Sequence, residues 1–267
     1  MNPGTIILFQ RSLDSGRTWS PPLRLTGIEP YALGTFVAIG RLGEVYVAWM
    51  NGNPETTLWF RRSLDGGRSF DPPVAIARFT APLVEEGLRN FVREFTFRVF
   101  TLAFLGTDTT TGPDGGRIYA VWQQLRPRGV SPEEAESVDI MIAVSRDRGR
   151  TWSRPRKATD TPPRAVAFFP FLSVSPRTGT VNLVYYTNRV RRDRLDVFLA
   201  RGVNHGRLWL PDERVTDTSF DPNADPLGQR FIGDYIGCAA RRDVDRAEAV
   251  WCDTRRGTED IFAAPEA

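Results

Sequence analysis

One short motif occurs four times along the chain and constrains the fold more than any other feature of the sequence. It reads SLDSGRTW at 12–19, SLDGGRSF at 63–70, SRDRGRTW at 145–152 and, in a weaker copy, GVNHGRLW at 202–209. Asp and Ser side chains accept backbone N–H bonds in tight turns, and Gly permits a positive φ. The motif therefore predicts the same tight turn at four places in a repeated structure.

Strand-like segments recur around the motif in a constant order. Three of them, called A, B and C, precede each later copy, and a short segment D follows it. Segment B reads GEVYVAWMN at 43–51, GRIYAVWQQ at 116–124, GTVNLVYYT at 179–187 and DRAEAVWCD at 245–253. Four-stranded sheets in series predict an all-β fold, a β-propeller of four-stranded antiparallel blades. A two-sheet sandwich, the alternative, does not explain the repeated order A, B, C, turn, D.

The strand count divides this single domain into five segments. They are a partial blade at 1–27, blades at about 33–78, 96–160 and 167–217, and a partial blade at 231–267. The first segment supplies only C and D, and the last supplies only A, B and C. The absent strands would all precede Met1, so we expect N-terminal sequence to be missing. A complete ring would have five blades, or six if a whole blade is also missing; an open five-bladed variant is the alternative.

The motif S-x-D-x-G-x-T-W resembles the Asp-box, or BNR repeat, of sialidases and related β-propellers. The resemblance extends over the whole chain, and GDYIGCAA…AVWCDTRRGTEDIFAA is similar to the closing blade of bacterial sialidase-like proteins. It implies a carbohydrate-directed bacterial protein that is secreted or at the cell surface, although no signal segment opens this chain. Asp-boxes also occur in propellers without sialidase activity, so the resemblance implies architecture more than activity.

The repeated aspartates are predicted to hold the turn and not to do chemistry. The Ser and Asp side chains would form hydrogen bonds within the turn, and Gly would adopt a positive φ. The last aromatic residue would pack inward as a plug. In the fourth copy Asn204 replaces Asp, and an amide can replace a hydrogen-bonding carboxylate but cannot transfer a proton. The predicted structural residues are Ser12, Asp14, Gly16, Trp19, Ser63, Asp65, Gly67, Phe70, Ser145, Asp147, Gly149, Trp152, Asn204, Gly206 and Trp209.

The order of the strands also predicts where a site lies. In an A-B-C-D meander the C–D turns lie on one face, and the B–C and D–A loops lie on the other. Irregular sequence is concentrated in those loops, at 79–95, 123–137, 187–194, 218–234 and 253–259. Long loops on one rigid face are a common place for function. We therefore expect the site on the loop face, opposite the repeated aspartates.

The chemistry that the resemblance implies needs four kinds of group. Arginines hold a substrate carboxylate, a tyrosine acts as nucleophile, a carboxylate activates the tyrosine, and a separate acid protonates the leaving oxygen. On the loop face the chain offers Tyr235 beside Asp234 as the catalytic pair, with Arg230, Arg255 and Arg189 as carboxylate-binding residues.

A structural interpretation of the same residues stays open. The segment GDY at 233–235 would then only begin the innermost strand, and Asp253 would pair with Arg255. No FRIP-like segment, which supplies the first arginine in sialidases, is visible. Its expected position precedes the first Asp-box.

Other chemistries are not indicated. His205 is the only histidine, which argues against a Ser–His triad and against a His-based zinc site. The loop TDTTTGPDGG at 107–116 lacks the acidic spacing of an EF-hand, so no cofactor is predicted and calcium is left open. Cys238 and Cys252 could face each other across a hairpin, and a disulfide between them is also left open.

Charge and hydropathy narrow the expected partners. The net charge is +3, but the basic residues are not clustered along the sequence, so nucleic acid is not expected. No apolar run approaches the ~18–20 residues of a membrane span. The expected partner is a carbohydrate or glycoconjugate. Two functions remain: an exo-glycosidase that releases sialic or a related acidic sugar, and a non-catalytic propeller that binds glycan or protein.

Overall fold

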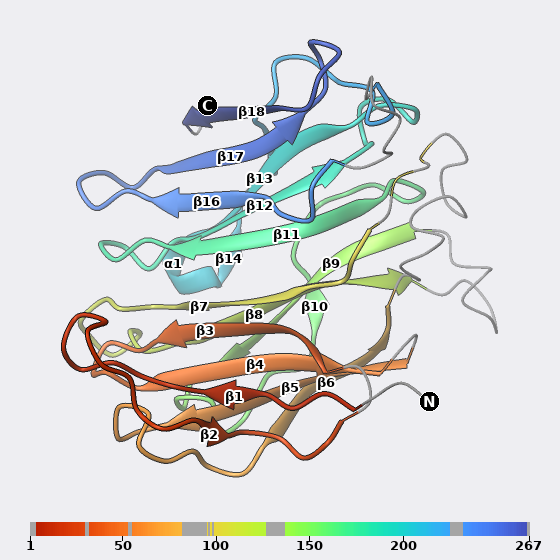
Figure 1. Cartoon of the computed structure of the whole chain (residues 1–267). Helices are drawn as coiled ribbons and strands as arrows, with labels where there is room; N and C mark the ends of the chain where they lie inside the picture. The colour runs from red at the N-terminus through yellow and green to blue at the C-terminus, as the bar shows by residue number, and fades with distance from the viewer. Residues whose placement is uncertain are drawn as a thin grey trace.

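Five antiparallel β-sheets follow one another along the chain and are arranged as a fan (Figure 1). This computed structural model describes residues 4–29, 32–52, 55–81, 95, 97, 99–126, 137–224 and 232–265. We call the sheets blades 1 to 5. Their strands are β1 (Leu8–Phe9) and β2 (Leu23–Arg24); β3 (Leu33–Ile39), β4 (Val45–Asn51), β5 (Glu55–Ser63) and β6 (Val74–Thr80); β7 (Ala103–Thr107), β8 (Ile118–Arg126), β9 (Ser137–Ser145) and β10 (Arg156–Lys157); β11 (Ala167–Val174), β12 (Val181–Thr187), β13 (Asp196–Gly202), β14 (Leu208–Trp209) and β15 (Glu213–Arg214); and β16 (Gly237–Ala240), β17 (Ala247–Asp253) and β18 (Asp260–Pro265).

Within each blade, neighbouring strands of the sheet are neighbours in sequence, as in a meander. The first strands of blades 2 to 5 also contact one another in the order β3, β7, β11, β16, so they share the inner side of the fan. In Figure 1 the C–D turns lie on the left, and the strand ends that lead into the B–C and D–A loops lie on the right. The all-β fold of serial antiparallel sheets agrees with the sequence prediction. Among the described residues no sheet joins blade 1 to blade 5.

An apolar cluster fills each gap between adjacent blades. Between blades 2 and 3, for example, the rings of Phe79 and Trp122 stack with centroids 5.6 Å apart. Every residue of β12, and every residue of β4 except Asn51, is buried, because a blade covers each face. In strand β17 the first four residues, 247–250, instead alternate between buried and exposed, since only blade 4 covers blade 5. The sheets are therefore held together by side chains from their faces.

The four turns of the repeated motif, which we call Asp-box turns after the resemblance in sequence, are fixed by the same hydrogen bonds in the first three copies. In the third copy, the hydroxyl of Ser145 donates to Asp147 (2.9 Å) and accepts from the Gly149 N–H (2.7 Å). Asp147 accepts from both the N–H (2.9 Å) and the hydroxyl (2.6 Å) of Thr151. Burial raises the pKa of Asp147, but these bonds outweigh it and lower that pKa to about 2. The aspartate is thus occupied as a hydrogen-bond acceptor.

The fourth copy holds its turn differently, and the predicted role of Asn204 is wrong. Gly202 stands where the other copies have Ser, so no hydroxyl is there to organise the loop. Asn204 and His205 both adopt the left-handed conformation (φ 51° and 57°), and the Asn204 side chain is exposed without a described hydrogen bond. The His205 ring instead contacts Asp108 of blade 3 (2.5 Å).

Each later Asp-box turn docks on the blade that precedes it. The ring of Phe70 packs edge-on against Phe9, and Trp152 packs likewise against Phe60, with centroids 5.0 Å apart in both pairs. The residue before the motif also takes part: Arg62 donates to the carbonyl of Arg148 (3.0 Å) in the next turn. The equivalent Arg11 donates to the second turn. The turn is therefore an inter-blade contact as well as a local one.

The predicted packing of Trp19 is wrong, and the disulfide that the sequence left open is not formed. Trp19 is 62% exposed and does not pack as a plug, because the described residues include no blade before blade 1 for it to dock on. Cys238 and Cys252 are free thiols. In the sheet register Cys238 lies opposite Ala249 and Cys252 lies opposite Ile261, so the two never face each other.

Two glycine substitutions separate the inter-blade contact from the local turn. Gly149 and Gly16 have φ of +81° and +85°, so alanine strains both by a similar amount, about 1–2 kcal/mol. A Cβ at Gly149 would lie 2.3 Å from Phe60, whereas a Cβ at Gly16 would meet nothing within 4 Å. We expect Gly149→Ala to cost about 1–3 kcal/mol more than Gly16→Ala in urea denaturation. Equal losses would contradict docking on the preceding blade.

Candidate functional site

Tyr235 is the exposed aromatic residue of the predicted catalytic pair. It lies just before β16 on the loop face, 70% exposed, and its phenol makes no hydrogen bond to another described residue. Ile232 and Ile236 are buried between blades 4 and 5, so they anchor the segment from which Tyr235 projects. Asp234 beside it is half-buried. The predicted Arg230 falls outside the described residues.

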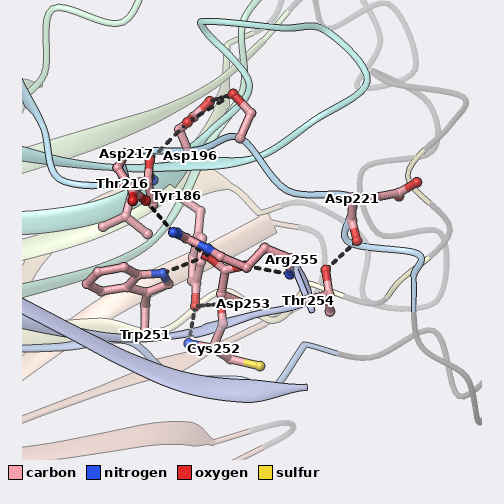
Figure 2. A network of polar contacts seen from close by, with 12 residues as sticks. Tyr186, Asp196, Thr216, Asp217, Asp221, Trp251, Cys252, Asp253, Thr254 and Arg255 are labelled. Carbon is pink, nitrogen blue, oxygen red and sulfur yellow. Dashed lines mark hydrogen bonds and ion pairs between the residues drawn. The ribbon is translucent and has the colours of Figure 1, made fainter. Parts of the chain in front are cut away.

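Arg255 lies in a network of polar contacts at the end of β17 (Figure 2). Its guanidinium donates twice to the fully buried carboxylate of Asp253 (2.8 and 2.6 Å) and once to Asp217, which ends segment D of blade 4. Trp251 donates its indole N–H to the same Asp253 (3.2 Å). The guanidinium also lies over the ring of Phe262, 4.5 Å from its centroid. Arg255 therefore joins blade 5 to blade 4.

Neighbouring contacts reinforce the same junction. In Figure 2 the hydroxyl of Tyr186 lies against the backbone of Cys252, accepting from its N–H (2.9 Å) and donating to its carbonyl (3.0 Å). The buried carboxylate of Asp196 accepts from Arg214 (2.6 Å) and from the hydroxyl of Thr216 (2.9 Å). Every buried charge here has a charged partner or hydrogen-bond donors, as burial requires.

Arg189 occupies the equivalent position one blade earlier. Both arginines follow the aromatic residue of segment B by four positions, and Arg189 lies over Phe198, 4.7 Å from its centroid. Arg189 donates to Asp160, which ends segment D of blade 3. Arg189 and Arg255 thus make the same inter-blade contact in two separate clusters. The structure does not bring them together, and both are bound to carboxylates of the protein itself.

Two carboxyl groups meet beside Arg189 with opposite pKa shifts. Burial and the hydrogen bond to Asp160 raise the pKa of Asp212 to about 7. The pKa of Asp160 is lowered, since bonds from Asp212 and Arg189 outweigh its desolvation. The hydroxyl of Tyr185 donates to Asp212 (2.6 Å), and each aspartate accepts the backbone N–H of the other (2.9 and 3.1 Å). Below about pH 7, Asp212 therefore holds a proton that an exposed aspartate would have lost.

This pair fits a clamp between blades 3 and 4 better than a hydrolytic site. The Asp212 side chain is only 2% exposed, so a substrate does not reach it. Each carboxyl group accepts the backbone N–H of the other residue. Glycosidases that use two carboxyl groups hold them about 5–10 Å apart, which leaves room for the sugar or a water.

Aspartates that recur at fixed positions of the repeat mark these contacts in the sequence, although they were not among the predicted site residues. Segment D ends in Thr-Asp in two blades, at 159–160 and 216–217. The second residue of segment C is Asp in blades 3 and 4, and it pairs with a basic residue of the same blade: Asp139 with Lys157 (2.9 Å) and Asp196 with Arg214 (2.6 Å). Aligning the blades by their Asp-boxes would have revealed both repeats.

Acidic groups of the described residues are mostly paired with arginine. In loop 107–116 Asp114 bonds to Arg117 and to Arg207, and Asp108 contacts His205. Within the described ranges, no three His, Cys, Asp or Glu side chains converge in a way that could hold a metal ion. The same part of the chain contains no helix of the length and hydropathy needed to cross a membrane.

Comparison with known proteins shows the fold. No protein-family model and no curated protein matches the sequence. A Hadza microbial sialidase is similar in structure, with a TM-score of 0.56 and 14% identity over 87% of this chain and 44% of the sialidase. A Dyadobacter fermentans protein of unknown function has a TM-score of 0.53 and 16% identity, over 99% and 68%. An α-L-arabinofuranosidase of Fusarium graminearum has a TM-score of 0.51 and 13% identity, over 88% of this chain and 62% of the arabinofuranosidase.

Sequence identities of 13–16% support a conclusion about the fold alone. At such identities the likeness shows a shared all-β architecture of serial sheets and does not transfer an activity. The chain spans less than half of the sialidase and somewhat less than two thirds of the arabinofuranosidase.

The Asp212 carboxyl predicts a stability that falls as pH rises. Its pKa of about 7 in the folded protein lies above the ordinary 3.8, so from about pH 4 to 7 the folded state holds a proton that the unfolded chain has lost. At 1.36 kcal/mol per pKa unit, the free energy of unfolding should fall by about 2–3 kcal/mol between pH 5 and 8. Asp212→Asn should remove this fall in urea denaturation. Glu248→Gln, which changes an exposed carboxylate, should keep it; an unchanged fall in Asp212→Asn would contradict the assignment.

Proposed function

We propose that the protein is a propeller that binds carbohydrate on its loop face, with Tyr235 as a contact residue. The observation that carries this proposal is the exposed ring of Tyr235, held by two buried isoleucines on the face opposite the Asp-box turns. An aromatic ring offers a sugar an apolar surface, and its hydroxyl offers a hydrogen bond. The likeness of the fold to a sialidase and an arabinofuranosidase supports a saccharide as the ligand.

Two features favour binding over hydrolysis. The phenol of Tyr235 has no hydrogen bond to a described base, and an unassisted tyrosine is a weak nucleophile near neutral pH because its ordinary pKa is about 10. Arg189 and Arg255, which would have to hold a substrate carboxylate, are already bound to Asp160, Asp253 and Asp217. A ligand carboxylate would have to displace those partners.

An exo-glycosidase that releases sialic or a related acidic sugar is the second candidate. It is supported by the position of Tyr235 next to Asp234 on the loop face and by the structural likeness to a sialidase. In this candidate Asp234 would take the phenolic proton as Tyr235 attacks the anomeric carbon, and a separate acid would protonate the leaving oxygen.

Binding is tested with sialyllactose and an arabino-oligosaccharide by titration calorimetry. Tyr235→Ala should weaken the saccharide that binds wild-type protein by at least about tenfold, equivalent to 1.4 kcal/mol. Tyr235→Phe should stay within about threefold, because it keeps the ring. Trp19→Ala removes an exposed aromatic residue from the opposite face and is the matched control. Wild-type affinity in Tyr235→Ala, or loss of affinity in Trp19→Ala, would contradict the proposed site.

A fluorogenic sialoside separates the two candidates. Turnover by wild-type protein that Tyr235→Phe abolishes would establish the glycosidase and overturn a purely binding role. Saccharide binding without turnover supports the proposal. Turnover that survives Tyr235→Phe would remove Tyr235 as the nucleophile.

A further inference from the structure

Two cavities border the third Asp-box turn, on the face that carries the C–D turns (left in Figure 1). The larger, of about 390 Å³, lies between blades 2 and 3, and the smaller, of about 300 Å³, lies between blades 3 and 4. Arg117 and Arg146 line both, so the cavities adjoin. We call their eight arginines the arginine face. They are Arg41, Arg117, Arg146, Arg148, Arg150, Arg154, Arg156 and Arg207.

Positive charge dominates this face. Five arginines and no carboxylate line the smaller cavity. Five arginines and three carboxylates line the larger one, and each carboxylate is already engaged. Glu44 accepts the N–H of Leu42 (2.9 Å), Asp108 contacts the ring of His205 (2.5 Å), and Asp147 is the acceptor of its own turn. The carboxylates are thus bound to protein groups while much of the guanidinium surface stays open.

The arginines differ in how they are held. Arg117 and Arg207 both bond to Asp114, and Arg156 donates to the carbonyl of Gly206 (3.0 Å), so these three are positioned by the protein. Arg148 forms an ion pair with Glu44 (3.9 Å). The other four are exposed and form no ion pair with any residue that the structure describes: Arg41, Arg146, Arg150 and Arg154. A guanidinium that is exposed and unpaired is available to an anionic ligand.

The fold gathers charges that are dispersed along the sequence. An arginine follows the glycine in all four copies of the motif: Arg17, Arg68, Arg150 and Arg207. All four are exposed on the C–D turns. These four arginines are more than 50 positions apart, whereas five arginines of the arginine face lie close together at 146–156. Since every C–D turn lies on one face, the repeat itself concentrates arginine there.

We propose that the arginine face binds a linear saccharide polyanion, one that carries sulfate or carboxylate groups in series. Guanidinium groups hold such anions through two parallel hydrogen bonds. Arginines open to two adjoining cavities suit a ligand with several charges better than a single small anion. Single-stranded nucleic acid is disfavoured because the only aromatic ring that lines the cavities apart from His205 is Tyr46, which is buried, so bases have no stacking platform.

This site is separate from the one proposed at Tyr235. It lies at the opposite ends of the strands, and the nine residues of β8 span roughly 30 Å from one face to the other. It does not depend on the loop face being a saccharide site. A variant that abolishes binding at one site therefore leaves binding at the other site testable.

The test uses dextran sulfate as probe, with neutral dextran of the same length as its control. The variant R146Q/R150Q/R154Q removes three exposed arginines of the face. The matched variant R78Q/R164Q/R191Q removes the same charge from exposed arginines that line neither cavity. Wild-type protein should bind dextran sulfate and not dextran. The first variant should weaken binding at least about tenfold, and the second should stay within about threefold.

The salt dependence gives a second readout. In the first variant, the slope of log Kd against log salt should fall by about two to three, close to one per lost contact. Arg41→Gln alone should weaken dextran sulfate binding by less than the triple variant does. It tests the same face if the triple variant does not fold. Tyr235→Ala should bind dextran sulfate as the wild type does, which separates this site from the loop face.

Three results would overturn the proposal. Equal weakening in the two triple variants would mean that only net charge matters. Competition by inorganic sulfate at the same concentration of anionic groups as the polymer would mean a small-anion site. Tighter binding of a single-stranded DNA oligomer than of dextran sulfate would mean a nucleic-acid surface.

Discussion

The docking of each Asp-box turn on the preceding blade is the contact on which the arrangement of blades depends. Hydrogen bonds to Ser145 and Asp147 shape the third turn locally, and Trp152 and the backbone of that turn then meet Phe60 and Arg62 of blade 2. The same relation joins the second turn to blade 1. A motif that repeats for local reasons therefore also fixes the distance between sheets, and the apolar clusters fill the gaps that result.

A second set of contacts fastens the blades at the opposite ends of their strands. Arg189 and Arg255 each lie over an aromatic ring of their own blade and bond to the last aspartate of the blade before. Blades 3 to 5 are thus held on the loop face by arginine–aspartate pairs, and blades 1 to 4 on the turn face mainly by Asp-boxes. Arg189 and Arg255, which were predicted to bind a substrate carboxylate, therefore bind carboxylates of the protein instead. The exposed residues of the two proposed binding sites are Tyr235 on the loop face and the arginines on the turn face.

Local features were predictable because they depend on neighbouring residues. The turn glycines, the serine–aspartate bonds and the strand order all follow from eight-residue motifs and alternating segments. The inward packing of Trp19 and the hydrogen-bonding role of Asn204 were predicted wrongly. Trp19 needs a preceding blade, and Asn204 needs the serine that Gly202 replaces. For the candidate site, the structural interpretation of the sequence named the pair of Arg255 and Asp253, which the structure shows. It did not name Asp160 and Asp217, since those partners of Arg189 and Arg255 belong to other blades.

By itself, the sequence determined an all-β chain of serial four-stranded units, the shape of their turns and the face on which long loops lie. Period-two strands and short hydrogen-bonded turns encode these within a few residues. Only the tertiary structure decided which charges meet: Asp212 with Asp160, Arg255 with Asp217, and eight arginines around two cavities. The partners in each of the two pairs are separated by tens of positions along the chain, and the eight arginines come from positions 41 to 207. No local pattern specifies the packing of one blade face against the next.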